Sequence, residues 1–283
     1  MKLNNIEIIA NSKGKNSKKI VDCIAVFLNE HGINYTVHYT YEFTQKVVLQ
    51  DDIDLLISIG GDGTVLFSAQ LVEKLNCPIL AINLGTFGYI TEISHNEWKN
   101  ALLQIMSGEE QVSSRLLLNT SVVRNGEVVY SRSSLNESVI TSSGISRVVY
   151  LDFYINETKA GAFKSDGVII ATPTGSTAYS LACGGPILYN DMEAFVITPI
   201  CPFTLSDRPI VVGQDHIVKI IIKENQRTDV ILSIDGQSTF ELEESDVVIV
   251  KKNISSIHLI SSNVRNYTQI IKNKLKWSGG LNA

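Results

Sequence analysis

The spacing of apolar residues changes near Gly108, and this change constrains the fold more than any other feature of the chain. Before it, short apolar runs at residues 6–10 and 54–59 alternate with segments of helical spacing, such as the one that begins at Ser17. Strands that alternate with helices form a parallel sheet that is covered on both faces. The first part of the chain is therefore predicted to be an α/β domain.

Beyond Gly108 the spacing is that of β-strands. Residues 116–131 are typical of a hairpin with an Asn125-Gly126 turn, and short β-type runs recur as far as residue 260. Helical spacing returns only at residues 268–277, which we expect to pack back on the first domain. We predict that the second domain is mainly β, with two packed sheets. The predicted domains are residues 1–107, 108–262 and 263–283.

Composition and charge exclude several classes of protein. Of the 283 residues, 44% are hydrophobic and 19% are charged, which is the balance of a globular protein. No run approaches the roughly 18 apolar residues of a membrane-spanning helix, and the first residues lack the apolar core of a signal peptide. The net charge of −5 argues against nucleic acid as a partner. We expect a soluble cytoplasmic protein that binds neither a membrane nor nucleic acid.

The cysteines and histidines form no metal-binding pattern. The four cysteines, at positions 23, 77, 183 and 201, include no CxxC pair, and the five histidines include no HExxH group. We predict buried thiols in a reducing compartment and no structural metal.

A glycine-rich loop, Gly60-Gly61-Asp62-Gly63-Thr64, joins a predicted strand to a predicted helix that begins at about Thr64. The loop is not a P-loop, because GxxxxGK is absent, and Leu66 replaces the third glycine of a dinucleotide fingerprint. Its glycines let backbone N–H groups approach a ligand, and the helix N-terminus favours anions. The loop therefore suits phosphate and presents Asp62 at the carboxyl end of a strand, with a plain turn as the alternative.

A second polar group surrounds a predicted strand at residues 167–171. Lys164 and Asp166 precede this strand, and Thr172-Pro173-Thr174-Gly175-Ser176-Thr177-Ala178-Tyr179-Ser180 follows it. The hydroxyls of this run suit a ribose or a phosphate, and the ring of Tyr179 suits stacking on a base. A solvated Ser/Thr loop is the alternative interpretation.

Six motifs occur in a fixed order between residues 58 and 237. They are the GGDGT loop, Asn83-Leu84-Gly85-Thr86-Phe87-Gly88-Tyr89, Leu135-Asn136-Glu137, the run from Ser165 through Pro186, Thr198-Pro199-Ile200-Cys201-Pro202 and Asp235-Gly236-Gln237. Together they resemble the motifs of the NAD kinase family. The GGDGT loop alone is also similar to motifs of diacylglycerol kinases, sphingosine kinases and phosphofructokinases, so the specificity comes from the other motifs.

The resemblance implies a Rossmann-like α/β N-terminal domain and a β-sandwich C-terminal domain. It implies an enzyme that phosphorylates the adenosine 2′-hydroxyl of NAD to give NADP. The donor would be ATP, another nucleoside triphosphate or polyphosphate, used with a divalent metal cation such as Mg²⁺. Family members are usually homo-oligomers.

The resemblance also implies roles for individual residues. Asp62 would accept the proton of the 2′-hydroxyl, with Gly63 beside the dinucleotide. Asn136 and Glu137 would hydrogen-bond the ribose and base region of NAD. Residues 177–182 would line the adenine pocket, and Gln237 would close the site. The full set of implied NAD contacts is Asp62, Gly63, Asn136, Glu137, Arg147, Lys164, Asp166, Thr177, Ala178, Tyr179, Ser180, Leu181, Ala182 and Gln237.

Four local features are interpreted separately. Phe203 stands where the family often has His, so the polar or subunit contact of that His is not expected here, and Tyr189-Asn190 replaces a frequent His-Pro. A basic cluster is interpreted as a solvated helix start, with a triphosphate contact as the alternative: Lys13, Lys15, Lys18 and Lys19. An acidic turn is expected to face water: Glu241, Glu243, Glu244 and Asp246.

The sequence favours direct phosphoryl transfer, because no activated Ser or Cys nucleophile is evident and this chemistry depends on positioning and charge stabilisation. Asp62 would act as the base or, alternatively, would hold the metal. Two other functions remain open at this point. A lipid or sugar kinase is disfavoured by the motifs at residues 136–137 and 172–180, and a non-catalytic NAD-binding regulator is disfavoured by an intact Asp62.

Overall fold

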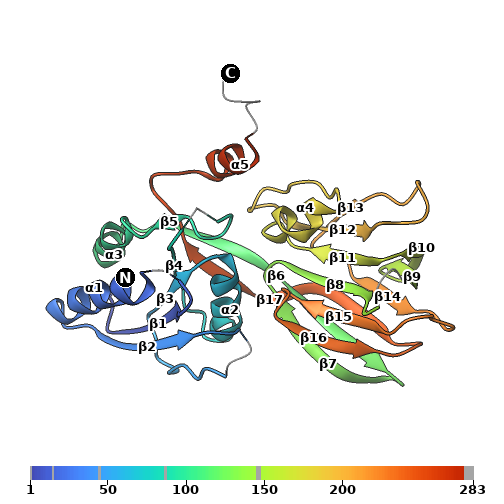
Figure 1. Ribbon diagram of the computed structural model, residues 1–283, viewed down its shortest axis with the longest axis horizontal. Coiled ribbons are helices and arrows are strands. Elements are labelled where there is room, and N and C mark those ends of the chain that lie inside the picture. The colour runs from blue at the N-terminus through green and yellow to red at the C-terminus, as the bar shows by residue number, and fades with distance from the viewer. Residues whose placement is uncertain (1, 15, 44–45, 86–87, 145–147, 277–283) are drawn as a thin grey trace. The chain divides into compact units, whose positions relative to one another are not determined.

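The computed structural model describes residues 2–14, 16–43, 46–85, 88–144 and 148–276. Contacts divide the chain into two compact units, which we call the α/β unit (Met1–Arg115 with Ser256–Ala283) and the β unit (Leu116–Ser255). The chain passes between them along two long strands, β6 (Val112–Arg124) and β17 (Val247–Ile260) (Figure 1). The sequence predicts domain boundaries at residues 107 and 262. These boundaries remain predictions, because the division into two units follows from contacts alone.

The α/β unit is built on a parallel sheet. Its strands, in spatial order, are β2 (Asn34–Thr40), β1 (Asn5–Asn11), β3 (Leu55–Gly60), β4 (Ile79–Asn83) and β5 (Ile93–Ser94). Every residue of β3 and β4 is buried, as expected of central parallel strands with both faces covered. Because these strands run in one direction, the loops that follow β1, β3 and β4 lie at one edge of the sheet.

Helices cover both faces of this sheet. They are α1 (Ser17–Glu30), α2 (Asp62–Val72) and α3 (Trp98–Ser107). A further helix, α5 (Tyr267–Leu275), follows β17 and is grouped with this unit, and its packing on the sheet remains a prediction. Figure 1 shows α1 and α3 on one side of the central strands and α2 on the other. The helical spacing of apolar residues places Ile24 of α1 and Leu102 of α3 in one core with Ile57 of β3. The α/β prediction is therefore confirmed.

The β unit contains a six-stranded antiparallel sheet packed on a second set of strands. The sheet has the order β13 (Ile210–Gly213), β12 (Ala194–Ile200), β11 (Gly167–Ala171), β8 (Glu137–Ser142), β15 (Val230–Ile234) and β16 (Ser238–Leu242). The second set comprises β10 (Thr158–Ser165), β9 (Val149–Ile155), β14 (Val218–Ile222), part of β17, and β6 with β7 (Glu127–Ser134). Ile140 and Phe195 of the first sheet share a core with Phe153 and Val248 of the second set, which confirms the mainly β prediction.

Two hairpin turns of the β unit have positive φ at both central positions, which defines the type I′ turn. The first is Asn125 (φ 53°) with Gly126 (φ 84°), as predicted from the sequence. The second is Asp235 (φ 51°) with Gly236 (φ 65°), which joins β15 to β16. The second turn places Asp235 directly after the buried strand β15.

The acidic turn that was expected to face water is partly buried. The exposed fraction of Asp246 is 1%, and Arg124 donates to it through Nε (2.9 Å) and Nη2 (2.8 Å). Arg124 also forms a hydrogen bond with Glu243, whose side chain is exposed. The expectation was wrong for Asp246, because its partner is 122 residues away in the sequence and no local pattern indicates it.

The four cysteines are free, but only one of them is buried. Burial raises the pKa of the Cys77 thiol to about 12. Cys183 is half-buried, and Cys23 and Cys201 are exposed, so the prediction that all four are buried was wrong.

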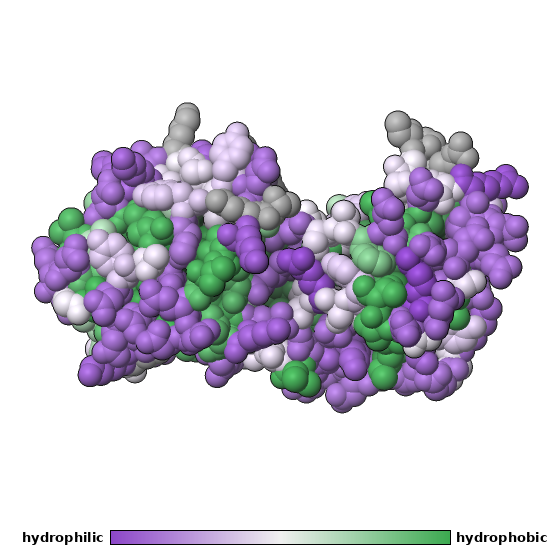
Figure 2. Space-filling view, turned by 90° about the horizontal axis from the view of Figure 1, so that it is seen from below, coloured by the Kyte–Doolittle hydropathy of each residue, from purple (hydrophilic) through white to green (hydrophobic). Residues whose placement is uncertain are grey.

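The surface mixes polar and apolar side chains. On the face shown in Figure 2, apolar side chains form separate groups among hydrophilic ones. Among the most exposed large apolar residues are Ile254 on β17 and Leu205 in the loop after β12. Within the described residues, no helix is long and apolar enough to span a membrane.

The left-handed backbone at Gly126 makes a prediction about stability. Among the described residues, a Cβ at either Gly126 or Gly161 would meet no atom within 4 Å, but only Gly126 has a positive φ. Gly126→Ala should therefore lower the free energy of unfolding by about 1 kcal/mol through backbone strain, whereas Gly161→Ala should not lower it. Denaturant unfolding of both variants measures this difference, and equal stabilities would contradict the strain argument.

Candidate active site

The glycine-rich loop ends β3 and begins α2. The helix starts at Asp62 and not at Thr64 as predicted, with Gly61 in the N-cap position. Asp62 therefore lies in the first turn, where the helix dipole favours a negative charge. A Cβ at Gly60 would lie 2.1 Å from Thr64 Oγ1, so glycine is required where the strand ends.

Four donors from the segment after β4 face the Asp62 carboxylate. Its Oδ1 accepts hydrogen bonds from the N–H groups of Ile90 (3.2 Å) and Thr91 (3.0 Å). The Thr91 hydroxyl donates to the same oxygen (3.0 Å), and the Tyr89 N–H donates to Oδ2 (2.9 Å). Among the described residues Oδ2 has this one partner, so Oδ2 keeps acceptor capacity for a ligand.

The proton of the Thr91 hydroxyl has a fixed direction. Asn83 Nδ2 donates to Thr91 Oγ1 (2.7 Å), and its amide is oriented because Asn83 Oδ1 accepts from the Gly85 N–H (2.6 Å). The Gly88 N–H also donates to Thr91 Oγ1 (3.1 Å). Two donors thus occupy the hydroxyl oxygen, and its single proton points to Asp62.

Gly88 lies directly against the carboxylate. A Cβ at Gly88 would lie 1.8 Å from Asp62 Oδ1 and 2.3 Å from Thr91 Oγ1, so only glycine fits there. Sequence reasoning cited Asn83 and Gly88 only as part of a family motif and did not assign Thr91 at all. The donors to the carboxylate, Tyr89, Ile90 and Thr91, are 27 to 29 positions from Asp62, and the local sequence carries no signal of that contact.

In the β unit, Asn136 and Glu137 stand where β8 begins. The Asp235 carboxylate accepts hydrogen bonds from three successive N–H groups, those of Leu135 (2.8 Å), Asn136 (2.8 Å) and Glu137 (3.0 Å). The turn after β15 therefore holds the backbone that carries the predicted pair. Asp235 was not predicted as a site residue, although its place in an Asp-Gly turn is a signal that points to it.

The side chains of Asn136 and Glu137 are buried polar groups. The exposed fraction of Glu137 is 8%, and burial raises the pKa of its carboxyl to about 8, with Asp235 adding to the rise and the Tyr179 N–H opposing it. Burial also raises the pKa of Asp235 to about 6. Asn136 Oδ1 and Glu137 Oε2 have no hydrogen-bond partner among the described residues. Such atoms cost folding free energy unless a ligand pairs with them.

The Ser/Thr-rich run after β11 uses its hydroxyls within the protein. A Cβ at Gly175 would lie 2.1 Å from the carbonyl oxygen of Asn136, so the run packs closely on the predicted pair. The hydroxyls that were expected to serve a ribose or a phosphate thus shape this loop. Their hydrogen bonds are Thr172 Oγ1 to Leu135 O, Ser176 Oγ to Pro173 O (2.6 Å), Thr177 Oγ1 to Thr174 O (3.2 Å) and Ser180 Oγ with Thr198 Oγ1 (2.8 Å).

Tyr179 interacts with predicted site residues from both ends of β11, namely Glu137 and Asp166. Lys164 and Asp166 precede β11, whereas Glu137 pairs with Ala171 at the other end of that strand. The Tyr179 N–H faces Glu137 from α4 (Tyr179–Ala182), which follows a 3₁₀ turn at Gly175–Thr177. The Tyr179 ring is 44% exposed. Burial raises the pKa of its phenol, and the raising is reinforced by Cys183, Cys201 and Asp166.

Phe203, which replaces the family His, contacts a predicted NAD residue. The ammonium group of Lys164 lies 4.1 Å from the centroid of the Phe203 ring, within the range of a cation–π interaction. The Phe203 N–H donates to the carbonyl oxygen of Lys164 (2.9 Å), although the Phe203 side chain is 73% exposed. Gln237 is half-buried and follows the Asp235 turn, and Arg147 lies outside the described residues.

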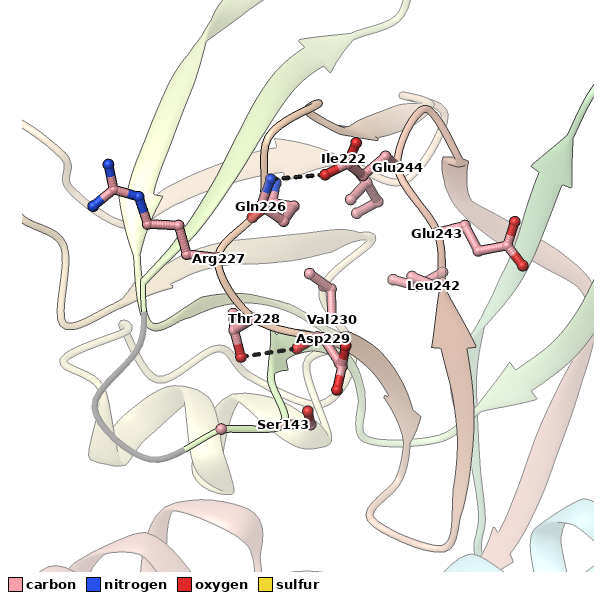
Figure 3. Close-up of a pocket in the computed structure, with 11 residues that line it drawn as sticks. Ser143, Ile222, Gln226, Arg227, Thr228, Asp229, Val230, Leu242, Glu243 and Glu244 are labelled. Atoms are coloured by element: carbon pink, nitrogen blue, oxygen red, sulfur yellow. Dashed lines mark hydrogen bonds between the residues drawn. The ribbon is translucent and has the colours of Figure 1, made fainter.

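A cavity of about 700 Å³ lies elsewhere in the β unit (Figure 3). It is bordered by Ser143, which follows β8, and by Asp229, which precedes β15. Because Ser142 pairs with Val230, this cavity is at the opposite end of these strands from Glu137. Figure 3 shows the Glu244 carboxylate held by the Gln226 N–H (2.8 Å) at its rim. None of the predicted site residues lines it.

Comparison with known proteins identifies the family. Residues 6–110 match the family model of the ATP-NAD kinase N-terminal domain, and residues 135–262 match that of the ATP-NAD kinase C-terminal domain. An NAD kinase of Treponema denticola is 40% identical over 272 residues, which cover 96% of each chain. The chain belongs to the NAD kinase family.

Other NAD kinases support this assignment. One from Caldanaerobacter subterraneus is 42% identical over 223 residues, 78% of each chain. Two solved structures share the fold. Yeast NADH kinase complexed with NADH has a TM-score of 0.87 at 23% identity, covering 99% of this chain and 89% of that one. An NAD kinase from Archaeoglobus fulgidus in complex with ATP has a TM-score of 0.77 at 20% identity, covering 97% and 99%.

The family assignment decides between the functions that the sequence left open. The chain is a phosphotransferase that converts NAD to NADP with ATP. The alternatives of a lipid or sugar kinase and of a non-catalytic NAD-binding regulator are therefore set aside. The resemblance inferred from the six motifs is confirmed.

The Thr91 hydroxyl should matter for turnover by this NAD kinase. Thr91→Val keeps the shape of the side chain but removes the donor to Asp62 and the acceptor for Asn83, whereas Thr91→Ser keeps the hydroxyl. We expect the valine variant to lose about tenfold in kcat, equivalent to about 1.4 kcal/mol, with the KM for NAD changed little. The serine variant should retain most of the activity. Steady-state kinetics of both variants measures this, and equal losses would show that the hydroxyl plays no part.

The raised pKa of Glu137 predicts how the stability of the protein depends on pH. The buried carboxyl has a folded-state pKa of about 8, against an ordinary value of 4.5 in the unfolded chain. Between these two pH values the unfolded chain releases the proton that the folded protein retains, so the free energy of unfolding falls as pH rises. Glu137→Gln should therefore raise Tm, by a margin that increases from pH 5 to pH 8, while the KM for NAD rises. Thermal unfolding across this pH range measures the margin. A pH-independent difference would contradict the assigned pKa.

Proposed function

We propose that Asp62 accepts the proton of the adenosine 2′-hydroxyl of NAD while the terminal phosphoryl group of ATP passes directly to that oxygen. The 2′-oxygen bonds to the γ-phosphorus, the bond to the β,γ-bridging oxygen breaks, ADP leaves with the electron pair, and the proton moves to Asp62 Oδ2. The observation that carries this proposal is the set of four donors that hold the carboxylate and leave acceptor capacity on Oδ2. Direct transfer depends on such positioning.

The donor phosphates would lie against the glycine-rich loop. Gly61 exposes its backbone, because a Cβ there would meet no atom within 4 Å among the described residues. The start of α2 adds the positive end of a helix dipole. We assign the phosphate contacts to Gly60, Gly61, Gly63 and Thr64.

NAD would be held by polar groups of the β unit. The support is the burial of Asn136 and Glu137 together with the unpaired atoms Asn136 Oδ1 and Glu137 Oε2, which suit ribose hydroxyls. Residues 177–182 would line the adenine pocket, where the exposed ring of Tyr179 offers a stacking surface. The further proposed contacts, carried by the family resemblance, are Gly63, Arg147, Lys164, Asp166 and Gln237.

A divalent cation, Mg²⁺ by preference, would accompany the nucleotide. Among the described residues no group of three or more His, Cys, Asp or Glu side chains is placed to hold a metal ion. This fits Mg²⁺, which is commonly held by one or two carboxylates together with substrate phosphates. In the alternative role considered for Asp62, its Oδ2 would be the protein oxygen that holds this cation. The cation would supply charge neutralisation of the transferred phosphoryl group.

Two further proposals concern the state of the protein in the cell. We infer a homo-oligomer, from the resemblance to the family, and a cytoplasmic location, from the composition and the cysteine pattern. Sedimentation of the purified protein tests the first, and fractionation of cells tests the second.

Replacing Asp62 tests its role as the base. Because donors face both carboxylate oxygens, Asp62→Asn must turn its amide NH₂ toward one of them, and Oδ2 is the less costly position since only the Tyr89 N–H faces it. Turnover should fall by roughly 10²–10⁴ through loss of the proton acceptor, while calorimetry shows NAD affinity within a few-fold of wild type. A matched control is Asp54→Asn, which also removes a carboxylate that accepts two N–H groups, those of Asn4 and Asn5.

Metal dependence separates the two roles considered for Asp62. If it were chiefly a metal ligand, higher Mg²⁺ or a change to Mn²⁺ would partly restore the variant and donor binding would weaken. A variant that keeps more than about a tenth of wild-type turnover, outside the range expected for a lost general base, would exclude both roles.

A further inference from the structure

A second cavity lies at the start of α1, in the α/β unit. Its volume is about 380 Å³, and it is lined by Ser12, Gly14, Asn16, Ser17, Lys18 and Tyr39. None of these residues has a role in the function proposed above. They belong to the loop that follows β1, to the first turn of α1 and to the end of β2.

Ser17, one of the residues that line this cavity, carries an unpaired hydroxyl. Its exposed fraction is 2%, and its Oγ has no hydrogen-bond partner among the described residues. Buried hydroxyls in folded proteins are nearly always paired. A buried, unpaired hydroxyl on a residue that lines a cavity favours a ligand that supplies the partner.

The first turn of α1 is arranged to attract an anion. Within the described structure, the N-cap residue Asn16 has a left-handed backbone (φ 69°) and makes no side-chain cap hydrogen bond. The first N–H groups of a helix have no partner within it, and they lie at the positive end of its dipole. The first turn contains no acidic residue, and Lys18 in that turn lines the cavity. Lys13, earlier in the loop, holds its ammonium group 3.9 Å from the centroid of the Tyr41 ring.

This cavity adjoins the loops that carry the proposed reaction. β1 and β3 are neighbours in the sheet, and a Cβ at Gly60 would lie 3.3 Å from Asn11 Cβ. A Cβ at Gly14 would lie 2.6 Å from Leu84 Cδ1, in the loop after β4. The end of β1 therefore adjoins the end of β3, where the glycine-rich loop begins, and the loop after β1 adjoins the loop after β4.

We propose that this cavity binds phosphate groups of the phosphoryl donor through the Ser17 hydroxyl, the Lys18 ammonium and the N–H groups of the first turn of α1 that follow Ser17. The Ser17 N–H itself donates to the carbonyl oxygen of Gly14 (3.1 Å). The identity of the ligand as the donor rests on the proposed function, whereas the affinity for phosphate groups does not. A chain of phosphates is common to ATP and to polyphosphate, and either source presents the same chemistry to this cavity.

Binding of inorganic tripolyphosphate to the full-length protein, measured by calorimetry, tests the proposal without turnover. Ser17→Ala and Lys18→Gln should each weaken binding by about threefold to tenfold, the effect of losing one typical hydrogen bond. Lys19→Gln is the matched control: it removes the same charge from the neighbouring exposed residue, which does not line the cavity. Its affinity should stay within about twofold of wild type. Since the Ser17 hydroxyl has no partner among the described residues, Ser17→Ala should not lower Tm.

Kinetics with two donors then identifies the source of the phosphates. In Ser17→Ala and Lys18→Gln the KM for ATP, for polyphosphate or for both should rise, while the KM for NAD stays constant. The donor whose KM rises is the one that occupies the cavity. A rise in the KM for NAD alone would overturn the proposal, because the loop would then serve the acceptor.

The proposed phosphate site and the proposed function can fail independently of each other. If wild-type protein forms NADP but both variants bind tripolyphosphate as wild type does, the phosphate site is wrong and the proposed function stands. If wild-type protein binds tripolyphosphate through Lys18 but the KM for every donor is unchanged in the variants, the cavity holds phosphate that is not the donor, and the proposal is wrong.

Discussion

The Asp62 carboxylate accepts three successive backbone N–H groups and one hydroxyl from residues 89–91, and the arrangement of the α/β unit around the reaction depends on this interaction. It ties the loop after β3 to the loop after β4 at the carboxyl edge of the sheet. It also explains why Gly88 has no space for a Cβ and why the Thr91 proton has one direction. A group held by fixed donors needs little reorganisation when charge moves in a reaction.

In the β unit, too, an aspartate carboxylate accepts successive backbone N–H groups, but there it positions two other side chains. Asp235 accepts three successive N–H groups and so positions Asn136 and Glu137, whose Oδ1 and Oε2 atoms have no hydrogen-bond partner among the described residues. A buried carboxyl with a pKa of about 8 does not stabilise the fold, and proteins retain such groups where a ligand uses them. In each unit an aspartate organises the backbone. The function of the site then depends on the few atoms that the fold leaves unpaired.

Much of the fold and part of the site follow from local sequence. The alternation of strand and helix spacing predicts the α/β unit. In the β unit, Asn125-Gly126 predicts the hairpin of β6 and β7, because this turn requires a positive φ at both positions. The partners of Asp62 and of Asp246 could not be predicted, since they are 27 to 29 and 122 residues away and their contacts form only when the sheets assemble. The start of α2 was misplaced because Gly61 offers no capping side chain that would mark it. The hydroxyls of residues 172–180 were assigned to ligands because a sequence does not show which ones the fold itself uses.

The central claim is that the phosphoryl group passes directly from the donor to the 2′-hydroxyl, with Asp62 as the proton acceptor. The stereochemistry at phosphorus tests this most directly. Turnover of ATP made chiral at its γ-phosphorus with oxygen isotopes, followed by configurational analysis of the 2′-phosphate of NADP, distinguishes one displacement from two. The account predicts inversion. Retention of configuration would reveal a phosphorylated enzyme intermediate and would contradict it.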